Sequence, residues 1–392
     1  MIELLAPAGD LEKLKYALIY GADAVFIGGN NFSLRARASN FNLDTIKEAV
    51  DFAHALGKKV YVTTNIIPHH EDLDGLIEYL KDLERVKVDA IIAASPVIIK
   101  TALDNTNLEV HLSTQQSAIN FEALKFWKNY GVKRIVLGRE LSLDEINLLP
   151  KGEVDLEVFI HGGMCMSFSG RCSLSNNLTL RDANRGGCAH SCRWQYYLYS
   201  DHNKVSDEFF SMSSKDLMAI REVPKLIDYK IASLKIEGRM KSLHYIATVV
   251  KTYRMLIDEY VKTGQIKSFE IYENEIFKAE NRLTSSGYLD GDIGPDKQLY
   301  EFMGERPNQA FIGLVNDYDK TSGIATIEQR NYFKIGDKIE VFSPNGDNKT
   351  FILDNMTDEK DTSIDVARHA QQIVKIKTPF PLEKYAMLRK LL

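Results

Sequence analysis

The sequence predicts an α/β protein: a TIM-like (β/α)8 barrel with a cysteine-rich insertion after its seventh strand, followed by a small C-terminal all-β barrel domain. Three observations predict this fold. A short β-branched run, a polar or Gly break and an amphipathic stretch recur along the chain, a segment with four cysteines interrupts the repeat, and short strands separated by turns fill the C-terminal part. Because periodicity does not reveal closure, a doubly wound open sheet is the alternative architecture.

The repeat places eight strands and the amphipathic helices between them. The expected strands are residues 2–5, 24–27, 60–63, 90–93, 110–113, 135–137, 156–160 and 231–236. The expected helices are residues 11–20, 43–56, 73–85, 97–103, 121–130 and 242–262. Asp10 is typical of a helix N-cap and Gly57 of a helix C-terminus, so they bound two of these helices.

Three regions follow from this pattern. Residues 1–264 form the barrel, with the insertion at residues 161–226. Residues 265–308 are polar and mixed, which predicts a helical linker. Residues 309–392 carry short apolar runs at 311–315, 323–327, 339–342 and 373–376, with turn signals such as Ser343-Pro344-Asn345-Gly346, which predicts a small β-barrel.

Composition and charge limit the class of protein. No apolar run reaches the length of about 20 residues that spans a bilayer, and the N-terminus lacks the pattern of a secretory signal, so we expect a cytoplasmic protein without a membrane. The net charge is -5, yet residues 165–254 hold 14 Lys and Arg against 8 Asp and Glu, a local +6. This segment predicts a polyanion site, unless folding spreads its charges over a mixed surface.

All four cysteines lie within 28 residues, in the spacing C-x6-C-x15-C-x3-C. Cys165, Cys172, Cys188 and Cys192 follow the seventh strand, on the catalytic face of a TIM-like barrel. In a reducing compartment such thiols predict a metal centre. Zinc and iron–sulfur clusters both accept four thiolates, but the long, uneven spacing favours an iron–sulfur cluster, with zinc or free redox thiols as alternatives. Nearby glycines let backbone amides approach the sulfur atoms. Arg171, Arg185 and Arg193 are the cationic side chains that we expect to offset the negative charge of the cluster.

Polar residues recur where the other strands end, on the same face of the barrel. For each of them a surface or loop-bracing role is the alternative to a functional one. His161 could assist proton transfer or could be a satisfied core histidine. The candidate catalytic residues are His161, Glu140, Lys235 and Glu237, and the candidate substrate-binding residues are Arg37, Asn65, Gln115, Arg139 and Arg239.

Several motifs resemble one known family over nearly the whole chain. They are residues 159–175 around Cys165 and Cys172, Leu4-Leu5-Ala6-Pro7-Ala8-Gly9, Leu112-Ser113-Thr114-Gln115, Leu234-Lys235-Ile236-Glu237-Gly238-Arg239 and the C-terminal β-domain. The chain resembles the collagenase-like peptidase family U-thirty-two, whose better-understood branches are iron–sulfur hydroxylases of tRNA, rRNA or ubiquinone precursors. Length, the β-domain and the short step from Cys188 to Cys192 make it most similar to the tRNA branch.

The resemblance implies an activity, cofactors and partners. It implies a 4Fe-4S cluster on the four cysteines and hydroxylation of a wobble uridine at C5, giving 5-hydroxyuridine, with prephenate as co-substrate. Arg37, Arg139 and Arg239 would then contact the carboxylates of prephenate, since arginine pairs well with such groups. The partners would be the tRNA anticodon loop, whose unstacked bases are accessible, and a possible partner subunit of the same family.

Three alternative functions stay open: a peptidase, a hydroxylase of another RNA, and a non-catalytic RNA-binding scaffold. Neither H-E-x-x-H nor G-x-S-x-G occurs in the sequence, which disfavours the common peptidase mechanisms.

Overall fold

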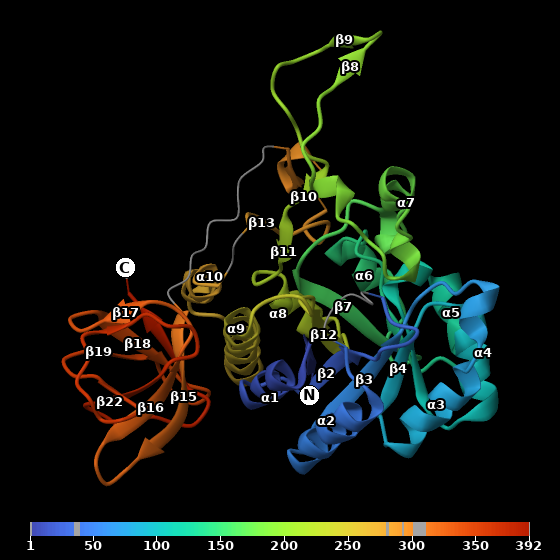
Figure 1. Ribbon diagram of the computed structural model, residues 1–392. Helices are drawn as coiled ribbons and strands as arrows, with labels where there is room; N and C mark the ends of the chain where they lie inside the picture. The colour runs from blue at the N-terminus through green and yellow to red at the C-terminus, as the bar shows by residue number, and fades with distance from the viewer. Residues whose placement is uncertain (1, 35–39, 280–281, 292–293, 301–310, 392) are drawn as a thin grey trace.

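The computed structural model describes residues 2–34, 40–279, 282–291, 294–300 and 311–391. Its centre is a closed barrel of eight parallel strands (Figure 1). Each strand pairs with the next along the chain, and the last pairs with both the first and the seventh, which closes the barrel and excludes the open sheet. The strands are β1 (Glu3–Pro7), β2 (Ala24–Gly28), β3 (Lys59–Thr64), β4 (Ala90–Ala93), β5 (Glu109–Leu112), β6 (Arg134–Val136), β7 (Asp155–Gly162) and β12 (Ser233–Ile236).

Helices surround this barrel on the outside (Figure 1). They are α1 (Leu11–Ile19), α2 (Leu43–Ala55), α3 (Leu76–Arg85), α4 (Pro96–Asn105), α5 (Phe121–Tyr130), α6 (Leu143–Leu148), α8 (Val223–Asp228) and α9 (Leu243–Thr263). The carboxylate of Asp10 accepts a hydrogen bond from the backbone N–H of Lys13, as an N-cap does. The helix expected over residues 73–85 is interrupted, because Gly75 has φ +75°. A short 3₁₀ helix, η1 (His70–Leu73), therefore precedes α3.

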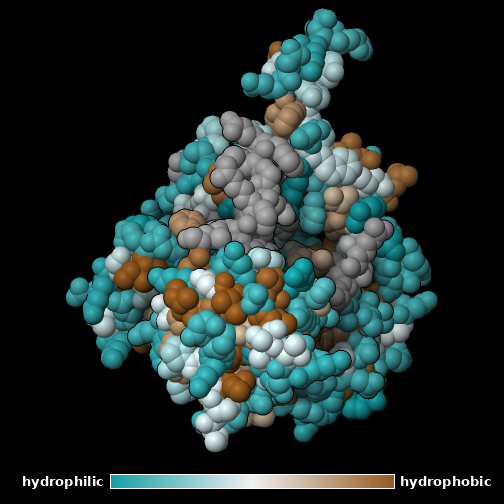
Figure 2. Space-filling view, turned by 60° about the vertical axis from the view of Figure 1, so that its left-hand side comes forward, coloured by the Kyte–Doolittle hydropathy of each residue, from teal (hydrophilic) through white to brown (hydrophobic). Residues whose placement is uncertain are grey.

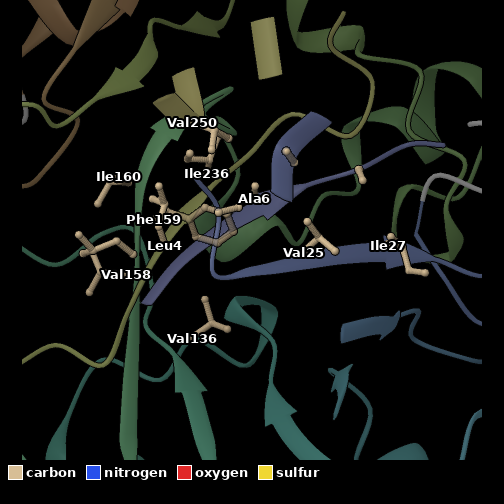
Figure 3. Packing of buried hydrophobic residues seen from close by; sticks show 14 of the residues in the cluster. Leu4, Ala6, Val25, Ile27, Val136, Val158, Phe159, Ile160, Ile236 and Val250 are labelled. Carbon is tan, nitrogen blue, oxygen red and sulfur yellow. The ribbon is translucent and has the colours of Figure 1, made fainter. Parts of the chain in front are cut away.

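Apolar side chains of the strands and helices form the main core. Figure 3 shows Leu4 of β1, Ile160 of β7 and Ile236 of β12 meeting Val250 of α9 in one cluster. Each of these four side chains is 0% exposed. The neighbouring residues along each strand point to the other side, into the barrel, because successive side chains of a strand face opposite ways.

The chain between β7 and β12 covers one end of the barrel. It contains the short helices η3 (Phe168–Gly170), α7 (Leu174–Thr179), η4 (Ala183–Arg185) and η5 (Ser191–Arg193). It also contains β8 (Tyr199–Ser200) and β9 (Asn203–Lys204), which form a hairpin that projects from the body (Figures 1 and 2). The strands β10 (Ser213–Ser214) and β11 (Asp216–Met218) lead back to the barrel, where β11 pairs antiparallel with β7.

The segment after α9 connects the two larger parts of the molecule. It contains α10 (Phe269–Phe277), β13 (Thr284–Ser285), η6 (Pro295–Lys297) and β14 (Gln298–Leu299). The two strands pair with the insertion, β13 with β11 and β14 with β10. This segment therefore lies against the insertion and continues its sheets. Among the described residues, no helix combines the length and the apolar character that a membrane crossing requires.

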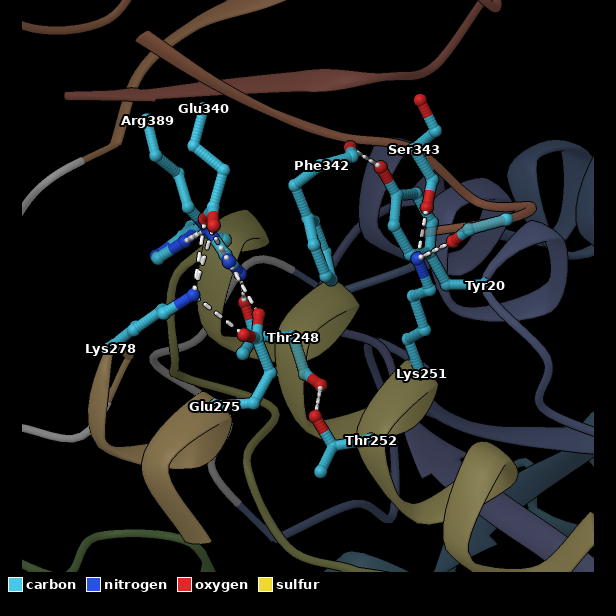
Figure 4. A network of polar contacts seen from close by, with 12 residues as sticks. Tyr20, Thr248, Lys251, Thr252, Glu275, Lys278, Glu340, Phe342, Ser343 and Arg389 are labelled. Carbon is cyan, nitrogen blue, oxygen red and sulfur yellow. Dashed lines mark hydrogen bonds and ion pairs between the residues drawn. The ribbon is translucent and has the colours of Figure 1, made fainter. Parts of the chain in front are cut away.

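The C-terminal part is all β, as the sequence predicts, and forms a half-barrel. Its seven-stranded antiparallel sheet has the order β19 (Lys349–Ile352), β18 (Lys338–Phe342), β23 (Met387–Lys390), β15 (Phe311–Asp319), β16 (Ile324–Gln329), β22 (Ile373–Lys377) and β20 (Thr357–Asp358). A two-stranded pair, β17 (Phe333–Lys334) with β21 (Val366–Ala367), accompanies it. The half-barrel packs beside α9 and α10, where polar contacts cross the interface (Figure 4).

Candidate active site

A cavity of about 710 Å³ lies where the barrel strands end and the insertion covers them. Its wall combines side chains from the ends of β2 to β7 and β12 with side chains of the insertion. Seven Lys and Arg residues line it against two Asp and Glu residues, so the wall has a net positive charge. An opening of this kind at the carboxyl ends of barrel strands is where the fold places its chemistry. It suits an anionic ligand.

All four cysteines border this one cavity. Burial raises the pKa of the Cys165 and Cys192 thiols, and the charges of the other cysteines raise both further. The thiols therefore lie near enough to influence one another. Within the described residues, no three His, Cys, Asp or Glu side chains are placed as ligands of a single metal ion.

Backbone and cationic groups surround the sulfur atoms. The backbone N–H of His190 donates to the Sγ of Cys188 at 3.5 Å, and the guanidinium of Arg181 donates to the Cys188 carbonyl at 3.3 Å. Burial of Cys172 is outweighed by hydrogen bonds from Ser167, Ser175 and Leu174, so its pKa is lowered. The donors to the sulfur atoms of Cys172 and Cys188 would stabilise thiolates.

The three arginines expected beside the cysteines have different positions. Arg193 lines the cavity, whereas Arg171 and Arg185 do not. Arg185 instead binds Asp72 at 2.7 Å and Glu71 at 3.2 Å, which ties the insertion to η1. Arg181, which the sequence did not single out, takes a place in the wall.

Lys235 lies at the inner end of the cavity, above a chain of ion pairs inside the barrel. Its Nζ is 2.7 Å from the carboxylate of Glu157, which is 0% exposed. Arg134 connects Glu157 to Glu3, so two cations alternate with two carboxylates. Burial opposes ionisation of Glu157, but Lys235 and Arg134 together hold its pKa below the usual value. The ammonium of Lys235 also lies 4.7 Å from the ring centre of Phe26.

Sequence reasoning missed Glu157, Arg134 and Glu3. The sequence contains a feature that could have identified them, since each is a charged residue within or beside an apolar strand. Along each barrel strand, residues that face the interior alternate with residues that face outward. A charged side chain that faces the interior is buried and therefore needs a partner of opposite charge on a neighbouring strand.

Four of the predicted substrate-binding residues lie at the cavity: Asn65, Gln115, Arg139 and Arg239. Arg239 is 4% exposed and donates to Ser33 Oγ at 3.0 Å and to Asn40 Oδ1 at 2.8 Å. Through these bonds Arg239 holds Ser33 and Asn40, which both follow β2, and so shapes the wall.

Arg139 lies differently. It donates to the carbonyl of Gly163 at 2.8 Å, and its guanidinium stacks 3.7 Å from the ring centre of Phe159. It therefore connects the end of β6 to the segment that carries Cys165. Arg37 lies outside the described residues.

The predicted catalytic residues divide into two groups. Lys235 and Glu237 line the cavity, whereas His161 and Glu140 do not. His161 is buried between β7 and α9, with its Nδ1 3.2 Å from the hydroxyl of Tyr253. Glu140 accepts hydrogen bonds from the backbone and hydroxyl of Ser169, so it braces η3 at a small neighbouring pocket of about 140 Å³. The geometry favours a structural role for both.

A second group of cavity residues comes from segments that carry no sequence motif. Asp216 is 0% exposed and binds Arg282 at 2.7 Å and Lys241 at 3.2 Å. All three residues line the cavity. They join β11, the loop after β12 and the segment after α10 in one wall. Only the folded arrangement brings these positions together.

Comparisons with known proteins agree with this architecture. The model of Peptidase family U32 matches residues 9–298, and the model of its C-terminal domain matches residues 307–389. The tRNA hydroxylation protein P1 of Bacillus subtilis is 48% identical, over 99% of this chain and 94% of its own length.

Two further relatives have other names. The 23S rRNA 5-hydroxycytidine synthase of Escherichia coli is 40% identical, over 67% of this chain and 40% of its own length. A collagenase of Porphyromonas gingivalis is 30% identical, over 87% of this chain and 86% of its own length. Both family models and these relatives show that the chain belongs to peptidase family U32.

Proposed function

We propose that this protein is an RNA-modifying enzyme that hydroxylates C5 of the wobble uridine in tRNA, with a 4Fe-4S cluster on its four cysteines and prephenate as co-substrate. The observation that carries the proposal is the convergence of four cysteines on a cationic cavity at the barrel mouth. The relative with 48% identity is named for tRNA hydroxylation, which favours tRNA as the substrate class. The proposal places the protein in the cytoplasm, where tRNA is found.

The residues present fit an iron–sulfur cluster. Cys165, Cys172, Cys188 and Cys192 border one cavity, and cysteine thiolates are the usual ligands of such clusters. A cluster holds its iron atoms apart and takes thiolates from several directions, whereas zinc needs four ligands around one point. Bound there, the cluster would supply electron transfer or a Lewis-acidic iron.

The protein's own residues would bind and orient the reactants. Arg139 and Arg193, both in the wall, are suited to the carboxylates of prephenate, because charge-assisted hydrogen bonds from arginine are strong. Lys235 and Glu237 line the same space, where an ammonium and a carboxylate can hold or move a proton beside the reacting base. The insertion covers the mouth and would exclude water.

The surface near the mouth suits single-stranded RNA. Trp194 precedes the β8–β9 hairpin and is 44% exposed, and Tyr197 and Tyr199, within it, are 48% and 59% exposed. Exposed aromatic rings stack on unpaired bases. The anticodon loop would reach the cavity past this hairpin, and a second subunit of the same family would be an additional partner.

Two alternatives have specific support from relatives. The collagenase of Porphyromonas gingivalis favours a peptidase, and the rRNA synthase favours another RNA. A cysteine peptidase needs a lone activated thiolate. Burial raises the pKa of Cys165 and Cys192, whereas hydrogen bonds outweigh burial and lower the pKa of Cys172. All four thiols share one cavity, which favours the metal centre over the peptidase.

Nucleoside mass spectrometry tests the proposal. A strain that lacks the gene should lose 5-hydroxyuridine from its tRNA and regain it with the wild-type gene, but not with Cys165→Ser. Phe126→Ala, which changes an exposed residue of α5, is the matched control and should restore the nucleoside. Anaerobically purified protein should absorb broadly in the visible. Unchanged tRNA in the deletion strain, or colourless protein that contains zinc, would refute it.

A further inference from the structure

Gln115 has an amide group that is held in one orientation at the cavity wall. The residue is 3% exposed and belongs to η2 (Thr114–Gln116), directly after β5. Its Oε1 accepts hydrogen bonds from Asn65 Nδ2 and from Ser113 Oγ, both at 3.2 Å. Its Nε2 has no hydrogen-bond partner among the described residues. A buried donor without a partner is costly unless a ligand satisfies it.

The backbone sets this orientation through Asn65. The N–H of Leu34 donates to Asn65 Oδ1 at 3.2 Å. A backbone N–H can only donate, so the oxygen of Asn65 must face Leu34 and its NH₂ group must face Gln115. Asn65 Nδ2 in turn needs an acceptor, which is Gln115 Oε1. The NH₂ group of Gln115 is therefore the end that is left for a ligand in the cavity.

We propose that Gln115 is the specificity-determining residue for the base: its Nε2 donates to the 4-oxo group of a pyrimidine, and Asn65 is the positioning residue that holds it as a donor. This inference rests on the proposed function and adds to it the choice between uridine and cytidine. Uracil presents an acceptor at position 4, whereas cytosine presents an NH₂ donor there. Two donors facing one another in a buried site exclude hydrogen bonding, so cytidine is rejected.

The charges of the cavity favour a neutral carbonyl beside Gln115. Lys235, which is buried and lines the same cavity, and Arg134 are already balanced by Glu157 and Glu3. A carboxylate at this depth would add an uncompensated charge, which is costly in a buried place. Carboxylates are better bound at Arg139 and Arg193, in the wall.

The test measures binding of two anticodon stem-loop RNAs, identical except for uridine or cytidine at the wobble position, to the full chain. Wild type should bind the uridine RNA about 10-fold to 100-fold more tightly, the effect of one unpaired buried donor. Gln115→Met keeps the size but removes the donor, so both RNAs should bind equally. Gln116→Met is the matched control on the same 3₁₀ helix, since Gln116 bonds the Ala94 carbonyl and does not line the cavity.

Asn65→Asp gives the sharper outcome. Its carboxylate can still accept from Leu34 but cannot donate, so Gln115 should rotate, donate to Asp and turn its oxygen to the cavity. This variant should prefer the cytidine RNA, a reversal that simple structural damage would not produce. Uridine preference retained in Gln115→Met would overturn the inference. So would an altered prephenate requirement in Gln115→Met with unchanged base preference, because the donor would then serve a carboxylate.

Binding is independent of turnover, so the two proposals fail separately. If wild type distinguishes the two RNAs but forms no 5-hydroxyuridine, the hydroxylase proposal fails and the base-reading role of Gln115 stands. If wild type hydroxylates tRNA but binds both RNAs equally, only the role of Gln115 fails.

Discussion

Arg239 reaches its hydrogen-bond partners through space that Gly28 leaves open. A Cβ at position 28 would lie 2.0 Å from the guanidinium Nη2 of Arg239. Gly28→Ala should therefore displace Arg239 and release its bonds to Ser33 and Asn40. We expect a loss of about 2–3 kcal/mol in the free energy of unfolding, the usual cost of overpacking, measured by denaturant titration.

Gly57→Ala is the control for this prediction. Gly57 has φ +68° and no atom near its added Cβ, so it tests backbone strain without a clash. Its cost should stay near 1 kcal/mol. If the two variants lose equal stability, a clash with Arg239 is not the cause of the destabilisation by Gly28→Ala.

At the scale of single residues, the sequence predicts those that follow strands. Gln115, Arg139 and Lys235 are found because parallel strands end at one face, whatever the loops do. Glu157 is not predicted as a site residue, because its partner Arg134 lies on another strand and a local sequence pattern does not reveal pairing between strands. The roles predicted for these residues stay predictions until variants are measured.

At the scale of elements, the N-terminus of α8 contains a carboxyl group with an unusual pKa. Burial, with a smaller effect of Asp290, raises the pKa of Glu222 to about 7, and Lys297 opposes this shift. In the unfolded chain the same group has a pKa near 4.3. The folded state thus binds its proton more tightly. Its contribution to stability is complete below pH 4.3 and is lost as the pH rises to about 7.

Glu222→Gln should remove this dependence. We expect the variant to gain about 1–3 kcal/mol in the free energy of unfolding at pH 8, and little at pH 4. Guanidinium titrations of the variant and the wild type at the two pH values measure the gain in the free energy of unfolding at each. Glu208→Gln, an exposed change in the hairpin, is the control and should show neither effect. An equal gain for Glu222→Gln at both pH values would contradict the assigned pKa.

The β8–β9 hairpin is an element whose removal should separate folding from RNA binding. Its base is secured by mutual backbone hydrogen bonds between Tyr196 and Phe210, and by the bond from Met212 N–H to the Cys192 carbonyl. Replacing residues 197–209 with a short Gly-Ser linker should leave thermal unfolding unchanged. Affinity for the anticodon stem-loop should fall, because each aromatic stack contributes about 1–3 kcal/mol. Unchanged RNA affinity, measured by fluorescence anisotropy, would remove the hairpin from the binding surface.

Element boundaries were predictable where caps and periodicity agree. The helix after Asp10 begins where the sequence indicates, because its cap is a local interaction. The helix expected from residue 73 starts later, at Leu76, because the left-handed backbone of Gly75 interrupts it. The hairpin lacks a periodic core pattern, since its aromatic residues face outward and not into the protein. Its form depends on the insertion as a whole.

At the scale of the molecule, the short apolar runs and turn signals predict a separate β-domain, but they do not predict how this domain packs against the barrel. Docking depends on Arg389, which is 0% exposed and lies between the half-barrel and the helices of the barrel (Figure 4). Its guanidinium binds Glu275 of α10, Glu340 of β18 and Thr248 of α9. It also donates to His244 Nε2 at 2.8 Å. Burial and this guanidinium hold the pKa of His244 well below its usual value.

Arg389→Met should uncouple the two parts. The substitution fills similar space but leaves the carboxylates of Glu275 and Glu340 buried with less compensation, which costs about 3–5 kcal/mol. Calorimetry of the full chain should then show two thermal transitions, with the half-barrel unfolding first. Arg330→Met is the matched control across the same interface, because its pair with Glu12 is half exposed and is worth under about 1 kcal/mol. A single transition with a small shift in Tm would mean that apolar contacts of Phe342, and not the buried guanidinium, join the half-barrel to the barrel.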